Sequence, residues 1–165
     1  MFDRILVTTD GSLLGNLALP YAADLARRYS SALTVLYVVP AAATPLALSE
    51  GAPYTNDFQA EQERLNAEGE SILDHAREAV GLPGTHFLRL DGSGSKLAQM
   101  IVDQIGREGA QLVVMGTHGR SGLAHLFLGS VAEEVMRKAD VPVLLVRQPA
   151  RVRNMKSGDP SVIVT

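Results

Sequence analysis

From residue 116 to residue 130 the chain reads Gly116-Thr-His-Gly-Arg-Ser-Gly-Leu-Ala-His-Leu-Phe-Leu-Gly-Ser130. The apolar run Leu112–Met115 comes directly before it, and its two valines favour a buried strand. Apolar residues at Val131 and Val135 come after it, with the spacing of one face of a helix. A glycine-rich loop between a buried strand and a helix is a place where backbone amides and a helix N-terminus can hold a phosphate.

The local pattern leaves a second interpretation open. Ser130 followed by Glu133 predicts a capping box, in which Ser130 caps the helix. Capping alone would explain the serine, and glycine-rich turns are often only turns. The loop matches neither Gly-x-x-x-x-Gly-Lys-Ser/Thr nor Gly-x-Gly-x-x-Gly. A similar turn at residues 91–96 fits neither pattern either, and its serines are better explained as helix caps.

Five strand patterns alternate with helical patterns along the chain. The first two are separated by one helix, which forms a βαβ unit and predicts parallel pairing. The expected strands are Ile5–Thr9, Leu33–Val39, Thr85–Leu90, Leu112–Met115 and Pro142–Val146. This alternation predicts a Rossmann-like, doubly wound α/β domain: a five-stranded parallel sheet with helices on both faces. Pro20 lies inside the first helical pattern and predicts a kink or a compensated bend there.

The amino-acid composition excludes several classes of function. The chain has 165 residues, enough for one domain with a real core. With no cysteine, disulfides, thiol catalysis and cysteine-ligated metals are excluded. A net charge of −3 without a basic run argues against nucleic acid as a partner. No apolar run approaches the ~20 residues of a membrane span. The N-terminus lacks a signal-peptide layout, so a cytoplasmic location is expected.

The character of the chain changes at Gln148. Residues 148–165 are polar and contain two prolines and a glycine. We therefore expect an α/β domain over residues 1–147 and a C-terminal tail over residues 148–165. Such a tail should be dispensable for the fold, and either mobile or packed on a partner subunit.

The glycine spacing carries a family resemblance. Gly116, Gly119, Gly129 and Ser130 follow the order Gly, two residues, Gly, nine residues, Gly-Ser. This resembles the nucleotide-binding motif of the ATP-binding universal stress proteins. The opening and the ending of the domain are similar too, so the resemblance covers residues 1–147. It implies the strand order 3-2-1-4-5 and a dimer.

The resemblance also implies a site. The family order puts the first and fourth strands side by side, where a crevice opens at their C-terminal ends. The segment Gly116–Gly119 would approach the ribose and phosphates of the nucleotide. Gly129, Ser130 and the Val131 amide would hold phosphate oxygens at the start of the helix.

Two further residues are implied on the opposite side of that crevice. Asp10 would accept a hydrogen bond from a ribose hydroxyl or help to hold Mg²⁺ or Mn²⁺, and Val38 would offer backbone groups to the adenine edge. Both have plainer interpretations. An aspartate before Gly11 is a common turn former, and Val38 belongs to the core in any case.

These features favour a stress-response regulator that holds ATP, AMP or ADP as a ligand and signals through a dimer to a protein partner. A slow ATPase or self-phosphorylating enzyme, and a dimeric module without nucleotide, are the alternatives. Phosphoryl transfer needs a positioned base and cationic clamps. No Walker lysine or dedicated base accompanies the loop, so no catalytic residue is assigned. Turnover should not exceed about one per minute, against ~1–10³ s⁻¹ for typical enzymes.

The dimer is expected at the last strand. In the family order Val143–Val146 is an edge strand, and no charge interrupts it before Arg147. An apolar edge of this kind tends to pair with another strand. We expect two copies to meet there, antiparallel and related by a two-fold axis.

Overall fold

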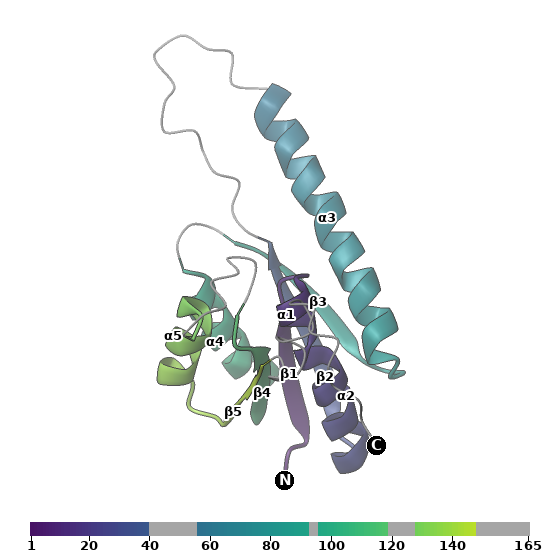
Figure 1. Ribbon diagram of the computed structural model, residues 1–165, viewed down its shortest axis with the longest axis vertical. Coiled ribbons are helices and arrows are strands. Elements are labelled where there is room, and N and C mark those ends of the chain that lie inside the picture. Colours follow the sequence, from purple (N-terminus) through teal and green to yellow (C-terminus); the bar gives the residue numbers. More distant parts are fainter. Residues whose placement is uncertain (40–55, 93–95, 119–127, 148–165) are drawn as a thin grey trace, which may run out of the picture.

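The computed structural model describes residues 1–39, 56–92, 96–118 and 128–147, without the side chains of residues 56–59 and 62. Five parallel strands form one sheet in the order β3-β2-β1-β4-β5 (Figure 1). The predicted α/β class and the strand order implied by the resemblance are therefore confirmed. The tail, residues 148–165, lies outside the described residues, so the domain boundary stays a prediction.

Strands and helices alternate as the periodicity predicts. They are β1 (Arg4–Thr9), α1 (Leu13–Asn16), α2 (Ala18–Tyr29), β2 (Ala32–Val39), α3 (Asn56–Val80), β3 (His86–Asp91), α4 (Leu97–Glu108), β4 (Leu112–Gly116), α5 (Ser130–Lys138) and β5 (Val143–Val146). No helix in the described part of the chain is long and apolar enough to cross a membrane.

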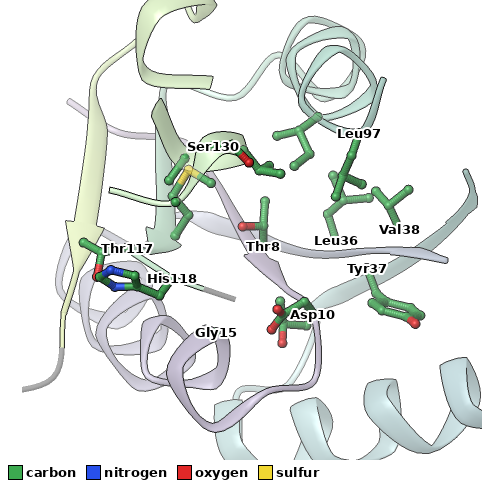
Figure 2. Close-up of a pocket in the computed structure, with 17 residues that line it drawn as sticks. Thr8, Asp10, Gly15, Leu36, Tyr37, Val38, Leu97, Thr117, His118 and Ser130 are labelled. Carbon is green, nitrogen blue, oxygen red and sulfur yellow. The ribbon is translucent and has the colours of Figure 1, made fainter. Parts of the chain in front are cut away.

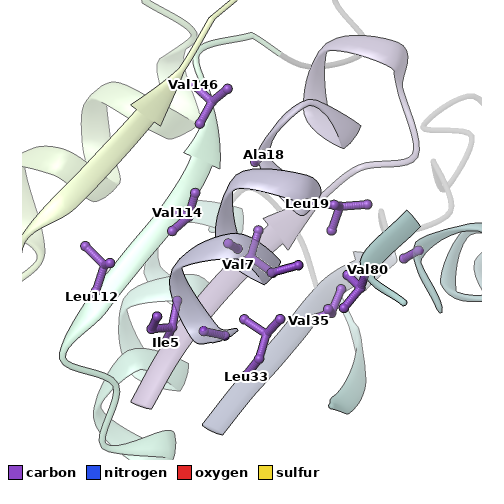
Figure 3. Packing of buried hydrophobic residues seen from close by; sticks show 14 residues of the cluster. Ile5, Val7, Ala18, Leu19, Leu33, Val35, Val80, Leu112, Val114 and Val146 are labelled. Carbon is purple, nitrogen blue, oxygen red and sulfur yellow. The ribbon is translucent and has the colours of Figure 1, made fainter. Parts of the chain in front are cut away.

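Helices α2 and α3 cover one face of the sheet (Figure 3). Ile5 and Val7 point to this face from β1, where they pack against a row of small residues on α2. That row consists of Ala18, Ala22, Ala23 and Ala26. Because alanine side chains are short, α2 can lie close to the strands it covers.

Helices α4 and α5 cover the opposite face. Leu6, the residue between Ile5 and Val7, points to this side and is fully buried. It packs in a cluster with Ile101 of α4 and Val135 of α5. Burying a side chain of this size contributes about 1.5–3 kcal/mol. Because side chains alternate along β1, the strand contributes residues to the core on both faces of the sheet.

The two edge strands differ from the central ones. Every residue of β3 keeps some exposure, as the alternating pattern of 85–90 predicts for an edge. At the other edge Leu144 of β5 is 38% exposed. Among the described strands, β5 pairs only with β4.

The first predicted helix is interrupted ahead of Pro20. The pattern divides into α1 and α2 at Leu17, which caps both helices in the αR conformation. Pro20 then falls in the first turn of α2, where a backbone N–H has no intrahelical acceptor to lose. The helix assignment is therefore interrupted at Leu17, and Pro20 removes no intrahelical hydrogen bond from α2.

Candidate functional site

A cavity of about 240 Å³ opens at the C-terminal ends of β1, β2 and β4 (Figure 2). It lies between the sheet and the first turns of α4 and α5. Its lining residues are Thr8, Thr9, Asp10, Gly15, Leu36, Tyr37, Val38, Leu97, Ile101, Met115, Gly116, Thr117, His118, Gly129, Ser130, Val131 and Ala132.

The position of this cavity follows from the strand order. β1 and β4 are neighbours, but the chain proceeds from β1 to β2 on one side and from β4 to β5 on the other. The connections therefore diverge, and in open α/β sheets ligands bind at such a switch point. Asp10 and Gly116, predicted to flank this crevice, both line the cavity.

A tight turn holds the Asp10 carboxylate at the cavity. The backbone N–H and the hydroxyl of Ser12 both donate to Oδ1 of Asp10, at 3.0 and 2.6 Å. The Ser12 hydroxyl in turn accepts from the Gly15 N–H (3.0 Å) and so caps α1. Gly11 has φ of +78°, a value that favours glycine. Asp10 is thus both a turn former and a cavity residue, so the two interpretations are compatible.

Gly15 belongs to the site, although sequence reasoning missed it. A Cβ on Gly15 would lie 2.1 Å from Oδ1 of Asp10. The carboxylate therefore occupies the space that a side chain would need. No motif marks Gly15, because the contact depends on how α1 folds back on the end of β1.

The two motif glycines in the described residues are required by close backbone packing. A Cβ on Gly116 would lie 2.8 Å from the Leu14 carbonyl oxygen, and one on Gly129 would lie 3.1 Å from that of Thr117. The Gly129 N–H also donates to the Thr117 carbonyl (2.8 Å). Gly119 lies outside the described residues.

The predicted capping box at Ser130 is wrong by one residue. Gly129 is the N-cap, with φ −61° and ψ 142°, and its carbonyl accepts from the Glu133 N–H at 2.9 Å. Ser130 is already the first residue of α5, which has no side-chain cap hydrogen bond. Gly129 is extended and its N–H donates to Thr117, so the helix begins at Ser130, one position earlier than predicted. As a result Ser130 and Val131, the first residues of an uncapped helix, line the cavity.

The other half of the cavity is apolar. It is lined by side chains from β2, α4 and β4, namely Leu36, Val38, Leu97, Ile101 and Met115. Only Val38 was expected at the site, and it is 8% exposed. In the sequence the other four look like ordinary core residues. Periodicity shows which face of a helix or strand is buried, but not where the core contains a cavity.

His118 also lies in the cavity wall. Its Nδ1 is 2.9 Å from the Thr117 hydroxyl oxygen. Among the described residues that line the cavity there is no lysine or arginine. Across the described residues, no group of three or more His, Asp or Glu side chains could hold a metal ion.

Sequence comparisons agree with this architecture. The model of the universal stress protein family matches residues 1–147. Universal stress protein MJ0531 of Methanocaldococcus jannaschii is 31% identical over 153 residues, which cover 92% of this chain and 85% of that protein. Universal stress protein YxiE of Bacillus subtilis is 32% identical over 149 residues, which cover 89% of this chain and 100% of that protein.

Solved structures share the fold. Protein MJ0577 of M. jannaschii superimposes with a TM-score of 0.71 at 24% identity, covering 91% of this chain and 99% of that one. A universal stress protein in complex with cAMP gives 0.64 at 24% identity (90% and 99% covered). One from Archaeoglobus fulgidus in complex with dAMP gives 0.60 at 24% identity (87% and 97% covered). With its sheet order, its switch-point cavity and a family match over residues 1–147, the chain belongs to the universal stress protein family.

Proposed function

We propose that this chain binds an adenine nucleotide, ATP or its relatives AMP and ADP, as a regulatory ligand in a stress response. One observation carries the proposal: a single cavity combines the Asp10 carboxylate, the uncapped start of α5 and an apolar slot. A nucleotide has three matching parts, which are ribose hydroxyls, anionic phosphates and a flat base. The cAMP and dAMP complexes of two proteins with this fold support an adenine mononucleotide as the chemical class.

The start of α5 would hold the phosphates. A helix N-terminus carries about half a positive charge, and its first amides have no intrahelical acceptor. The amides of Ser130 and Val131 lie there, and the Ser130 hydroxyl is not used as a cap. Gly129 and Gly116 keep the wall of the cavity free of side chains beside them, and Gly119 is predicted to continue that wall.

Asp10 and the apolar slot would hold the nucleoside. The carboxylate would accept from a ribose hydroxyl, a charge-assisted bond that is stronger than a neutral one. The base would lie against the slot that includes Leu36 and Met115, with the backbone of Val38 at its edge.

A divalent ion fits this arrangement. Mg²⁺ commonly takes one or two protein carboxylates together with substrate phosphates and water. Asp10 is the cavity's carboxylate, and nucleotide phosphates would supply the remaining oxygens. When bound, Mg²⁺ or Mn²⁺ would neutralise phosphate charge, while Asp10 keeps its place through the two Ser12 hydrogen bonds.

Binding rather than turnover is favoured by the composition of the wall. Phosphoryl transfer needs cationic groups that stabilise the charge of the transition state. The lining residues that the structure describes supply neither lysine nor arginine. We therefore keep slow hydrolysis or self-phosphorylation as the second candidate, with turnover of about one per minute or less, far below the usual ~1–10³ s⁻¹.

The Asp10→Asn variant tests the site. Asparagine keeps an Oδ1 acceptor for Ser12 but removes the charge, so the turn should persist. Titration calorimetry with MgATP should show binding to the parent and an affinity about tenfold or more weaker in the variant, because a hydrogen bond to a charged group is lost. Asp140→Asn is the matched control: Asp140 is exposed and outside the cavity lining, so the affinity should not change.

Nucleotide binding by the parent protein is the first test of the proposal. If it bound no ATP, ADP or AMP, and carried none through purification as seen by mass spectrometry, the proposed function would be wrong. Phosphate release at several per second from the same samples, lost in Asp10→Asn, would instead identify an enzyme.

We further propose that signalling proceeds through a dimer formed by β5. Its outer edge has no partner among the described strands, and Leu144 is partly exposed on it. Leu144→Lys would place a charge in the apolar contact, so light scattering at micromolar concentration should give a dimer mass for the parent and a monomer mass for the variant. Leu13→Lys is the control, because Leu13 is 90% exposed on α1 and should leave the dimer intact. A monomeric parent, or a dimer that survives Leu144→Lys, contradicts this contact.

A further inference from the structure

Thr8 places a hydroxyl group on the floor of the cavity. On β1, side chains alternate between the two faces, so Thr8 shares the α4–α5 side with Leu6. Its partner on β2 is Leu36, and the pairing of Val7 with Val114 puts Met115 beside it on β4. Thr8 is thus a polar side chain between two apolar residues of the slot, and all three line the cavity.

The Thr8 hydroxyl has no hydrogen-bond partner among the residues that the structure describes. Two other strand threonines differ in this respect. Thr9, next in sequence, accepts from the Gly11 N–H (3.0 Å), and its hydroxyl donates to Asn16. Thr34, on β2, donates to Oε2 of Glu108 (3.1 Å). Partly buried hydroxyl groups ordinarily find a partner in the protein, in water or in a ligand, and here the described residues supply none.

Packing alone does not call for a threonine at this position. Valine has nearly the same shape, suits a strand equally well, and would match the apolar residues on either side. Figure 2 shows Thr8 in the middle of the labelled residues, with Ser130 on one side and Asp10 on the other. A ligand that reaches from Asp10 to the start of α5 therefore passes over this hydroxyl.

We propose that Thr8 is a ligand-binding residue whose hydroxyl hydrogen-bonds the nucleoside half of the bound nucleotide. The inference rests on the proposed function and adds a residue to it. The nucleoside is favoured over the phosphates because the strand neighbours of Thr8, Leu36 and Met115, belong to the apolar slot. A hydroxyl can both donate and accept, so it can bond a ring nitrogen of the base or an oxygen of the ribose.

The test compares Thr8→Val with Thr34→Val. Each variant removes one hydroxyl from a strand with little change of shape. Thr8→Val should weaken binding of both MgATP and adenosine by the same factor, about two- to tenfold, because the two ligands share only the nucleoside. Its thermal midpoint should stay the same or rise, since no protein hydrogen bond is lost. Thr34→Val should show the reverse: a lower midpoint, because Glu108 loses a donor, and unchanged affinity.

Each outcome of this comparison either supports or contradicts the assignment of Thr8 to the nucleoside. If the parent binds nucleotide and Thr8→Val binds it equally well, this inference is wrong while the proposed function stands. A loss with MgATP but not with adenosine would place the hydroxyl at the phosphates and overturn the nucleoside assignment. A parent that binds neither ligand contradicts both proposals. Should Thr8→Val fail to fold, Thr8→Ser and Thr8→Ala replace it: serine must retain the affinity and alanine must lose it.

Discussion

Gly129→Val is expected to weaken nucleotide binding by about a hundredfold or more. Even a single Cβ at this position would lie 3.1 Å from the Thr117 carbonyl oxygen and 3.6 Å from Cα of His118. The branched side chain must therefore either enter the cavity or push the start of α5 away. Both outcomes separate the phosphates from the amides of Ser130 and Val131. Losing two charge-assisted hydrogen bonds, at about 1.5–3 kcal/mol each, accounts for a change of this size.

Calorimetry with MgATP measures the loss, after circular dichroism has shown that the variant is folded. Gly106→Val is the matched control. Gly106 is exposed on α4, and a Cβ there meets no atom within 4 Å. Its affinity should equal that of the parent. If Gly129→Val bound MgATP as tightly as the parent does, the phosphates would not lie at the start of α5 and the proposed site would be misplaced.

Gly116→Ala should lower the free energy of unfolding by about 1–3 kcal/mol, the usual cost of overpacking. The new Cβ would lie 2.8 Å from the Leu14 carbonyl oxygen and 3.2 Å from Cα of Gly15. These are backbone atoms, which cannot rotate away as the end of a side chain can. Helix α1 would have to shift as a unit on the end of β4, and the Asp10 turn would move with it. For a domain of this size the melting temperature should fall by about 2–4 °C per kcal/mol.

Urea or thermal denaturation measures this loss, and Gly106→Ala provides a control with the opposite sign. In an exposed helix interior, alanine is more stable than glycine by about 0.5–1 kcal/mol. A Gly116→Ala protein as stable as the parent would show that α1 does not pack tightly on β4. The role of Gly116 would then lie in ligand access alone.

Local patterns in the sequence were enough to predict the architecture. Runs such as Leu33–Val39 and Leu112–Met115 are apolar throughout because both sheet faces are covered, and the βαβ spacing requires parallel pairing. The strand order could not be predicted from local patterns, and it came from the family resemblance instead. That order determines where the cavity lies.

The sequence by itself determined which elements form, and it marked the loop from Gly116 to Ser130 as the place where a phosphate could bind. Periodicity and glycine spacing are local properties, so they can be read along the chain. The tertiary structure alone decided the contact of Gly15 with Asp10, the start of α5 at Ser130, and the place of Thr8, whose hydroxyl has no partner among the described residues. Each depends on atoms brought together from separate elements. In the sequence, nothing distinguishes the two residues of the Thr8-Thr9 pair. In the folded chain Thr9 donates to Asn16 of α1, whereas Thr8 lines the cavity.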